Sequence, residues 1–217
     1  MKKSLQFIGI LLLFIVSKAT AHPHAFIEMK AAPLVKNEQL VGFSMQWTLD
    51  EVSSSEILYD FMLVEDDQKA KQKMFDEMIK NVVNEHYFSY FYDDKGRKIK
   101  YTSTPQNYGL RAVRQQIQYY FDFMLTNPQP LTKAKYILST YDPTYYVSMY
   151  YNLPPDHKKT QSAVDFTALP SQCKGEVRMP NVDKKTQDYA ASLDQTQRDD
   201  DPTLGAIFAQ EVIILCD

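Results

Sequence analysis

The sequence is poor in glycine and cysteine and has no excess of positive charge, and each scarcity excludes a class of protein. Only 6 of 217 residues are glycine, whereas 15 are tyrosine and 12 phenylalanine, so the composition is not that of a disordered or low-complexity chain. With 24 basic against 27 acidic residues the chain lacks the basic footprint that nucleic-acid binding needs. This composition predicts a globular chain that buries a sizeable core.

Catalytic signatures are missing as well. The sequence contains no Gly-x-Ser-x-Gly, no His-Glu-x-x-His and no glycine-rich phosphate loop. Its two cysteines are far apart and do not form a Cys-x-x-Cys redox pair. We therefore expect a protein that is not an enzyme.

The N-terminus carries the one long apolar run. Lys2 and Lys3 precede an apolar stretch over residues 5–16, and Ala19-Thr20-Ala21 follows with the small-x-small pattern of a signal-peptidase site. A retained membrane anchor is the alternative, but the run is shorter than the roughly 20 residues that a membrane-spanning helix needs. We expect residues 1–21 to be cleaved, and residues 22–217 to form a single periplasmic domain with no stable membrane insertion.

Cleavage would leave Cys173 and Cys216 in an oxidising compartment. An isolated pair of cysteines there predicts a disulfide bond, while a role as thiolate metal ligands would suit a reducing cytoplasm better. Closing a loop of about 44 residues would stabilise the fold by roughly 4 kcal/mol on the chain-entropy estimate.

Alternation of apolar and polar residues with period two indicates a mainly β fold. It is clearest over residues 43–47 and 117–123, the latter with Asp122 on the polar face. Further strands are expected at 25–31, 88–92, 136–141, 145–151 and 211–216, with a hairpin signal at 93–96. Short strands separated by turns predict an antiparallel, sandwich-like arrangement.

One stretch, at about residues 51–85, has helical periodicity instead. Ser53 and Glu56 have the spacing of a capping box, and apolar residues follow at helical intervals. Six more, at positions 74, 75, 78, 79, 82 and 83, form the stripe of an amphipathic helix. The expected fold is therefore mainly β with an inserted pair of helices, α+β overall.

The segment His22-Pro23-His24 is the strongest candidate metal site. A mature N-terminal histidine offers an α-amine and an imidazole to one ion, and imidazole suits zinc, copper, nickel and cobalt. Pro23 has no amide hydrogen, so square-planar coordination through the second amide is blocked. The alternative is that both histidines are simply solvated next to the cleavage site.

Additional ligands are needed for a complete site. Asp50 and Glu51 stand at a strand end before a helix and are the best candidates, although capping of that helix explains them equally well. Glu28 lies about 13 Å from His24 along a strand, too far to share an ion. The isolated His86 and His157 are expected to be surface residues rather than ligands.

Several motifs together resemble a bacterial family, domain of unknown function 1007. They are the segments at 22–27 (HPHAFI), 47–51 (WTLDE), 141–147 (YDPTYYV) and 205–212 (GAIFAQEV), with the two cysteines. Members of this family are described as the periplasmic component of an uncharacterised transport system, and this chain is most similar to Haemophilus-type members linked with zinc acquisition. The resemblance implies an inner-membrane permease of the nickel/cobalt type as partner and a divalent transition metal as ligand.

The function expected from these observations is that of a periplasmic metal-binding accessory protein. Zinc is the first choice of metal, with nickel, cobalt or copper as alternatives. Two other functions remain open: a secreted copper enzyme that uses the N-terminal histidine chelate, and a structural partner of the permease that binds no metal.

Overall fold

A computed structural model describes residues 23–153, 163–193 and 203–217. The predicted signal peptide, His22 and His157 lie outside the described residues. The strands are β1 (Ala25–Lys36), β2 (Gln39–Leu49), β3 (Ser89–Asp93), β4 (Gln106–Val113), β5 (Gln116–Pro130), β6 (Ala134–Thr140), β7 (Val147–Tyr151), β8 (Cys173–Arg178) and β9 (Glu211–Cys216). The α-helices are α1 (Glu51–Leu63), α2 (Gln68–Asn84), α3 (Lys184–Ser192) and α4 (Leu204–Phe208).

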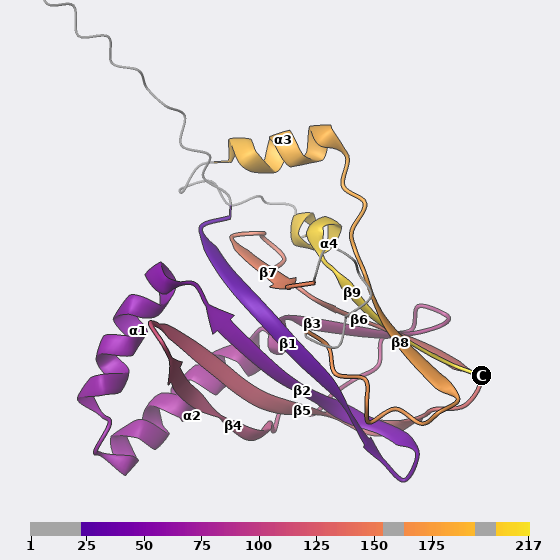
Figure 1. The fold of residues 1–217 in the computed structure, drawn as a ribbon, viewed down its shortest axis with the longest axis horizontal. Coiled ribbons are helices and arrows are strands. Elements are labelled where there is room, and N and C mark those ends of the chain that lie inside the picture. The colour runs from indigo at the N-terminus through magenta and orange to yellow at the C-terminus, as the bar shows by residue number, and fades with distance from the viewer. Residues whose placement is uncertain (1–22, 154–162, 194–202) are drawn as a thin grey trace, which may run out of the picture.

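The strands form two sheets (Figure 1). Five strands make the first sheet, in the order β4-β5-β2-β1-β7, and four make the second, in the order β3-β6-β9-β8. The predicted mainly β fold with added helices is confirmed. Pairing between neighbouring strands is antiparallel except that β1 and β7 run parallel.

The core lies on the face of the first sheet that faces the second. Alternate residues of β2, Phe43, Met45 and Trp47, are buried there. The ring centroid of Phe43 lies 5.2 Å from that of Phe91 on β3, in an edge-on arrangement. The apolar residues of the period-two pattern in β2 therefore form part of the core between the two sheets.

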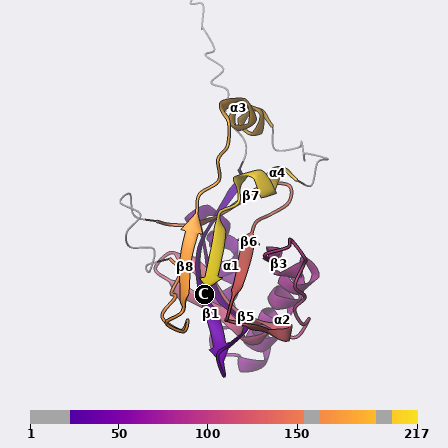
Figure 2. The same cartoon turned by 90° about the vertical axis from the view of Figure 1, so that its right-hand side faces the viewer.

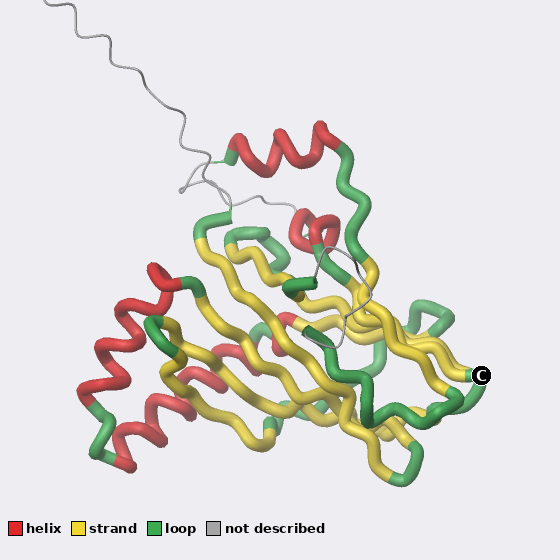
Figure 3. The backbone as a smooth tube through the Cα atoms, in the orientation of Figure 1, coloured by secondary structure: helices red, strands yellow, loops and turns green. Residues whose placement is uncertain are grey.

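The helices cover another part of that same face. Ile27 and Leu49 of the first sheet line a pocket together with Ile57 of α1 and with Met78 and Val82 of α2. In the view of Figure 3, α1 lies beside the strands of the first sheet and α2 passes behind them. The apolar stripe expected on the second helix is thus what attaches it to the sheet.

The predicted capping box at Ser53 and Glu56 is wrong. The N-cap lies three residues earlier, at Asp50, which accepts the backbone N–H of Ser53, and the helix begins at Glu51, in agreement with the predicted bounds of about 51–85. Ser53 itself stands inside the first turn. Its hydroxyl also donates to the Asp50 carboxylate, at 2.8 Å.

Two strands, β4 and β8, were not expected from the sequence. Both lie at the edge of a sheet, and most of their side chains reach solvent. β4 shows no clear alternation of burial, whereas β8 does, but the inward-facing residues of β8 are Cys173, Gly175 and Val177, which include only one aliphatic side chain. Gly175 of β8 is needed for close packing, since a Cβ there would lie 2.0 Å from the ring of Phe166. Edge strands with few buried apolar residues give only a weak periodicity signal.

The predicted disulfide is confirmed. Cys173 and Cys216 are bonded, and their Cα atoms are 4.0 Å apart at directly opposed positions of β8 and β9. The bond therefore links the last strand to the edge strand beside it.

Candidate metal centre

His24 lies at the entrance to β1, where the described chain begins. Its backbone N–H donates to the carbonyl oxygen of Tyr146 at 2.9 Å, and the two rings lie 4.8 Å apart with a tilt of 41°. Tyr146 stands directly before β7, the parallel neighbour of β1. The segment that follows the predicted chelate is therefore held against the start of β7.

Asp50 is fixed by hydrogen bonds at the same end of the first sheet. Its Oδ1 accepts the N–H of Ser53 at 2.9 Å, and its Oδ2 accepts the N–H of Phe26 at 2.8 Å. Phe26 is two residues along the chain from His24, so Asp50 ties the start of β1 to the start of α1. Burial alone would raise the pKa of Asp50, but the bonds from Ser53 and Phe26 outweigh it and hold the pKa below its ordinary value.

The loop between β6 and β7 is organised around Asp142. This side chain is 9% exposed, and its oxygens accept the N–H and hydroxyl of Thr144 and the N–H of Val147, each at 3.0 Å. The N–H of Gly205, in α4, donates to the carbonyl oxygen of Pro143 at 3.0 Å. No larger residue fits at that position, because a Cβ on Gly205 would lie 1.8 Å from the Asp142 carbonyl oxygen. The loop that carries Tyr146 is therefore rigidly supported.

The structure thus gathers the segments that carried the family resemblance. We call this region the His24 end, formed by residues 24–26, Asp50, the loop 142–147 and α4. Figures 1 and 2 show the start of β1, β7 and α4 together at one end of the molecule, with α3 nearby. These segments are far apart in the sequence, so their meeting is a property of the fold.

Not every predicted ligand takes part in a described contact at this end. Glu51 is exposed in the first turn of α1. His86 lines a different pocket, with Lys98 and Tyr101. Within residues 23–153, 163–193 and 203–217, no three His, Cys, Asp or Glu side chains are placed to hold a metal ion together. A complete site would need donors from His22, so the metal role of His22, His24, Asp50 and Glu51 stays a prediction.

Sequence reasoning missed the partners of His24. Tyr146 and the Asp142 loop were used only as part of a family motif and a strand. The segment Asp142-Pro143-Thr144 has the composition of a side-chain-capped turn, because aspartate readily accepts the N–H of the residue two positions later. That signal could have identified a rigid loop, but not its contact with His24, which depends on the pairing of β1 with β7.

An open groove of about 310 Å³ lies beside this end. Tyr145, Met149, Met179 and Phe208 are among the residues that line it. The side-chain amide of Gln210 bonds both the N–H and the carbonyl oxygen of Tyr151, at 2.6 and 3.1 Å, as a neighbouring strand would. Since the lining residues Tyr145, Met149, Met179 and Phe208 are apolar or aromatic, the groove gives the His24 end an apolar, aromatic border.

Comparisons with known proteins agree on the family. A family model described as "Protein of unknown function (DUF1007)" matches residues 7–216. The chain is also 50% identical over 205 residues to a Haemophilus influenzae protein (strain ATCC 51907 / DSM 11121 / KW20 / Rd) with the name "Uncharacterized protein", covering 94% of this chain and 96% of that protein. Among the described residues no helix is both long and apolar enough to cross a membrane. The chain therefore belongs to the DUF1007 family of proteins of unknown function.

Proposed function

We propose that this chain is a periplasmic accessory protein that binds a divalent transition metal, zinc first, and passes it to an inner-membrane permease of the nickel/cobalt type. The observation that supports the proposal best is the anchoring of His24 to Tyr146 at the end where Asp50 and the Asp142 loop meet. A chelate made by His22 and His24 would therefore project from a fixed base rather than from a loose tail. A fixed base reduces the entropy lost when the ion binds.

In this proposal the metal is an ion to be passed on, and a donor set that binds it without enclosing it suits that role. The α-amine and imidazole of His22 and the imidazole of His24 supply three nitrogen donors, which zinc accepts readily. Asp50 already accepts three hydrogen bonds, so its carboxylate has little capacity left for an ion. Glu51, which is exposed, would be a better oxygen ligand than Asp50, and it would bind the ion weakly and exchange readily. An open site with few protein ligands would release its ion to a partner faster than a closed cage of four.

The partner would meet an apolar surface at the His24 end. Phe26, Tyr146 and Tyr150 expose 45%, 37% and 36% of their surfaces, on β1 and on or beside β7. Aromatic side chains clustered on a surface are typical of protein contact sites. Docking there would bring the permease to the metal.

The copper-enzyme alternative is less well supported, because it needs a second histidine that converges on His22. In the described part of the chain the only other histidine besides His24 is His86, and it belongs to a separate pocket. Measuring the zinc affinity of the protein distinguishes our proposal from the alternative of a permease partner that binds no metal.

The first test is a zinc titration of correctly processed protein, beginning at His22 with its mass verified, against a competing chelator. The matched control carries one extra serine before His22, which keeps both imidazoles but moves the amine away. We expect the control to bind zinc at least about ten-fold more weakly, since one nitrogen donor is lost. Equal affinity of the two proteins would remove the amine from the site.

A second test uses Pro23. Changing Pro23→Ala restores an amide hydrogen, which makes a square-planar copper or nickel mode possible. We expect preference to move from zinc towards copper and nickel, together with the visible absorption band of square-planar copper. An unchanged order of metal affinities would contradict coordination by this terminus.

A further inference from the structure

A second pocket, of about 360 Å³, lies between the end of α2 and residues 98–103. Its floor is apolar, with Val83, Ile99 and Tyr101, and its rim carries three basic side chains, His86, Lys98 and Lys100. We call it the basic pocket. None of its lining residues belongs to the His24 end.

The two lysines of the basic pocket, Lys98 and Lys100, lack an acidic partner. Over residues 23–153, 163–193 and 203–217, neither Lys98 nor Lys100 forms an ion pair. The Lys98 ammonium lies 5.5 Å from the centre of the Tyr90 ring, a contact that does not neutralise its charge. Glu85, the acidic residue next to His86, lines the pocket of Trp47 and Phe88 instead.

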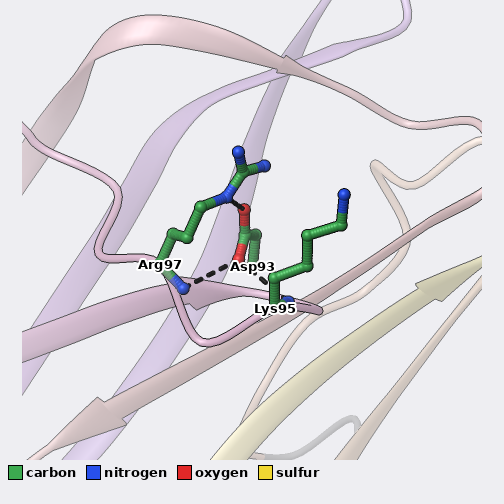
Figure 4. A network of polar contacts seen from close by, with 3 residues as sticks. All are labelled: Asp93, Lys95 and Arg97. Carbon is green, nitrogen blue, oxygen red and sulfur yellow. Dashed lines mark hydrogen bonds and ion pairs between the residues drawn. The ribbon is translucent and has the colours of Figure 1, made fainter.

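In the neighbouring turn, residues 93–97, a basic side chain does have an acidic partner. Asp93 neutralises Arg97, whose Nε donates to its Oδ2 at 2.6 Å and whose backbone N–H donates to its Oδ1 at 2.8 Å (Figure 4). The backbone N–H of Lys95 donates to the same Oδ1, at 3.0 Å, while its ammonium extends away from the carboxylate (Figure 4). Asp93 is thus used locally, and Lys98 and Lys100 place positive charge at the basic pocket of a chain whose net charge is −3.

The wall that carries His86 is a strained turn. His86, Tyr87 and Phe88 have φ values of 52°, 56° and 48°, three successive non-glycine residues in the left-handed region. Such residues cost roughly 1–2 kcal/mol each and persist only when their surroundings hold them.

Hydrogen bonds supply that hold. The Tyr101 hydroxyl shares its one proton between the carbonyl oxygens of His86 and Ser89, and the Ser89 hydroxyl donates to the carbonyl oxygen of Tyr87 at 2.8 Å. Buried Tyr87 donates to the carbonyl oxygen of Thr102 at 3.0 Å. Strain held this firmly is typical of binding sites, and here it presents an imidazole beside two unpaired lysines.

We propose that the basic pocket binds a small amphipathic organic anion. A carboxylate or phosphate group would lie between Lys98, Lys100 and His86, where charge-assisted hydrogen bonds form, and an apolar body would lie on Val83, Ile99 and Tyr101. The volume of the pocket is in the range of sites for small ligands. This inference does not depend on the metal function, because it uses none of the same residues.

The test uses four probes on isotopically labelled protein: octanoate, 1-octanol, inorganic phosphate, and vesicles of phosphatidylglycerol or phosphatidylcholine. We expect octanoate to shift the backbone amide signals of Ile99 and Thr102 and to bind more tightly than octanol or phosphate, which lack one half of the ligand. The Lys98→Ala/Lys100→Ala variant should bind octanoate at least about ten-fold more weakly. The matched control Lys69→Ala/Lys174→Ala removes the same charge from exposed positions outside the pocket and should bind as the native protein does.

The vesicle arm distinguishes the sources of the anion. Retention on phosphatidylglycerol but not phosphatidylcholine vesicles, lost in Lys98→Ala/Lys100→Ala, would support the proposal with a lipid headgroup as ligand. Binding of octanoate without retention on vesicles would support it with a free anion. Equal binding of octanol and octanoate, unchanged affinity in the double lysine variant, or no amide shifts with any probe would overturn it.

Discussion

Asp50 shows how a single residue serves the fold at the candidate site. Its carboxylate accepts the N–H of Ser53 in α1 and the N–H of Phe26 in β1, so one side chain joins the start of the helix to the strand that follows His24. The sequence offered two roles for Asp50, ligand or cap, and the described contacts are those of a cap. The sequence could not identify Phe26 as a partner, because that contact depends on the register of β1 and β2.

Replacing Asp50 should therefore destabilise the protein. We expect Asp50→Ala to lower the free energy of unfolding by about 1–2 kcal/mol, since a cap is lost and the Phe26 N–H loses its acceptor. Urea unfolding measures this change. The exposed Asp60→Ala in the same helix is the control and should change stability by less than about 0.5 kcal/mol.

The lowered pKa of Asp50 adds a pH dependence of known sign. A carboxyl group whose pKa is depressed by folding stabilises the folded state above its unfolded pKa, and that contribution disappears as the pH falls through the folded value. The stability difference between the native protein and Asp50→Asn should therefore be constant above about pH 5 and shrink below about pH 4. A difference that stays constant down to pH 3 would contradict the ionised cap.

The disulfide is the other residue-scale feature that the sequence predicted correctly. Its closed loop spans a sequence separation of 43. We expect Cys173→Ala/Cys216→Ala to lose about 4 kcal/mol of unfolding free energy on the chain-entropy estimate, measured by urea denaturation. Reducing the native protein should lower its stability to that of the variant. Two free thiols in the non-reduced native protein would exclude the bond in solution.

At the scale of elements, the sequence predicted those strands and helices whose apolar residues repeat at regular intervals. Buried strands such as β2 and the amphipathic helix α2 were found because their apolar residues repeat at intervals of two or near four. The edge strands β4 and β8 were not predicted, because few of their residues are both apolar and buried. The predicted cap of α1, Ser53, lies three residues after the observed cap, Asp50, because serine and aspartate are both good caps and local sequence does not separate them.

The turn after α2 was also beyond sequence reasoning. Three left-handed residues in succession are stabilised by Tyr101 and Thr102, which follow His86 by 15 and 16 positions, and His86, Tyr87 and Phe88 have no special preference for that geometry. Burial raises the pKa of Tyr87 to about 12, so its hydroxyl stays a donor throughout the neutral range. Only tertiary contacts hold such a segment.

This turn predicts an ordering of two variants at exposed position 86. Glycine adopts a positive φ without steric cost, whereas a β-branched residue does so poorly. We expect His86→Val to be less stable than His86→Gly by about 1–2 kcal/mol in thermal unfolding. The reverse order would mean that residue 86 has a negative φ in solution.

At the scale of the whole molecule, the fold does what the sequence alone could not: it brings distant motifs together. The motif segments are separated by up to about 180 residues, yet the parallel pairing of β1 with β7 and the contact of Gly205 with Pro143 place residues 24–26, the loop 142–147 and α4 at one end. The sequence identified these segments as motifs of the family, but not their arrangement in space. The basic pocket could not be predicted from the sequence for the same reason. His86 approaches Lys98 and Lys100 only because of the turn after α2.

The central claim, that His22 and His24 form the metal site, is tested most directly by one comparison of zinc affinities. The proteins are the processed native chain, His22→Ala/His24→Ala, and the control His86→Ala, each checked for folding by circular dichroism. Because both substituted histidines stand next to the proposed mature terminus, the double variant is expected to keep its fold. We predict that it binds zinc more than about ten-fold more weakly than the native protein, while His86→Ala binds as the native protein does. A double variant that binds zinc as tightly as the native chain would contradict the account.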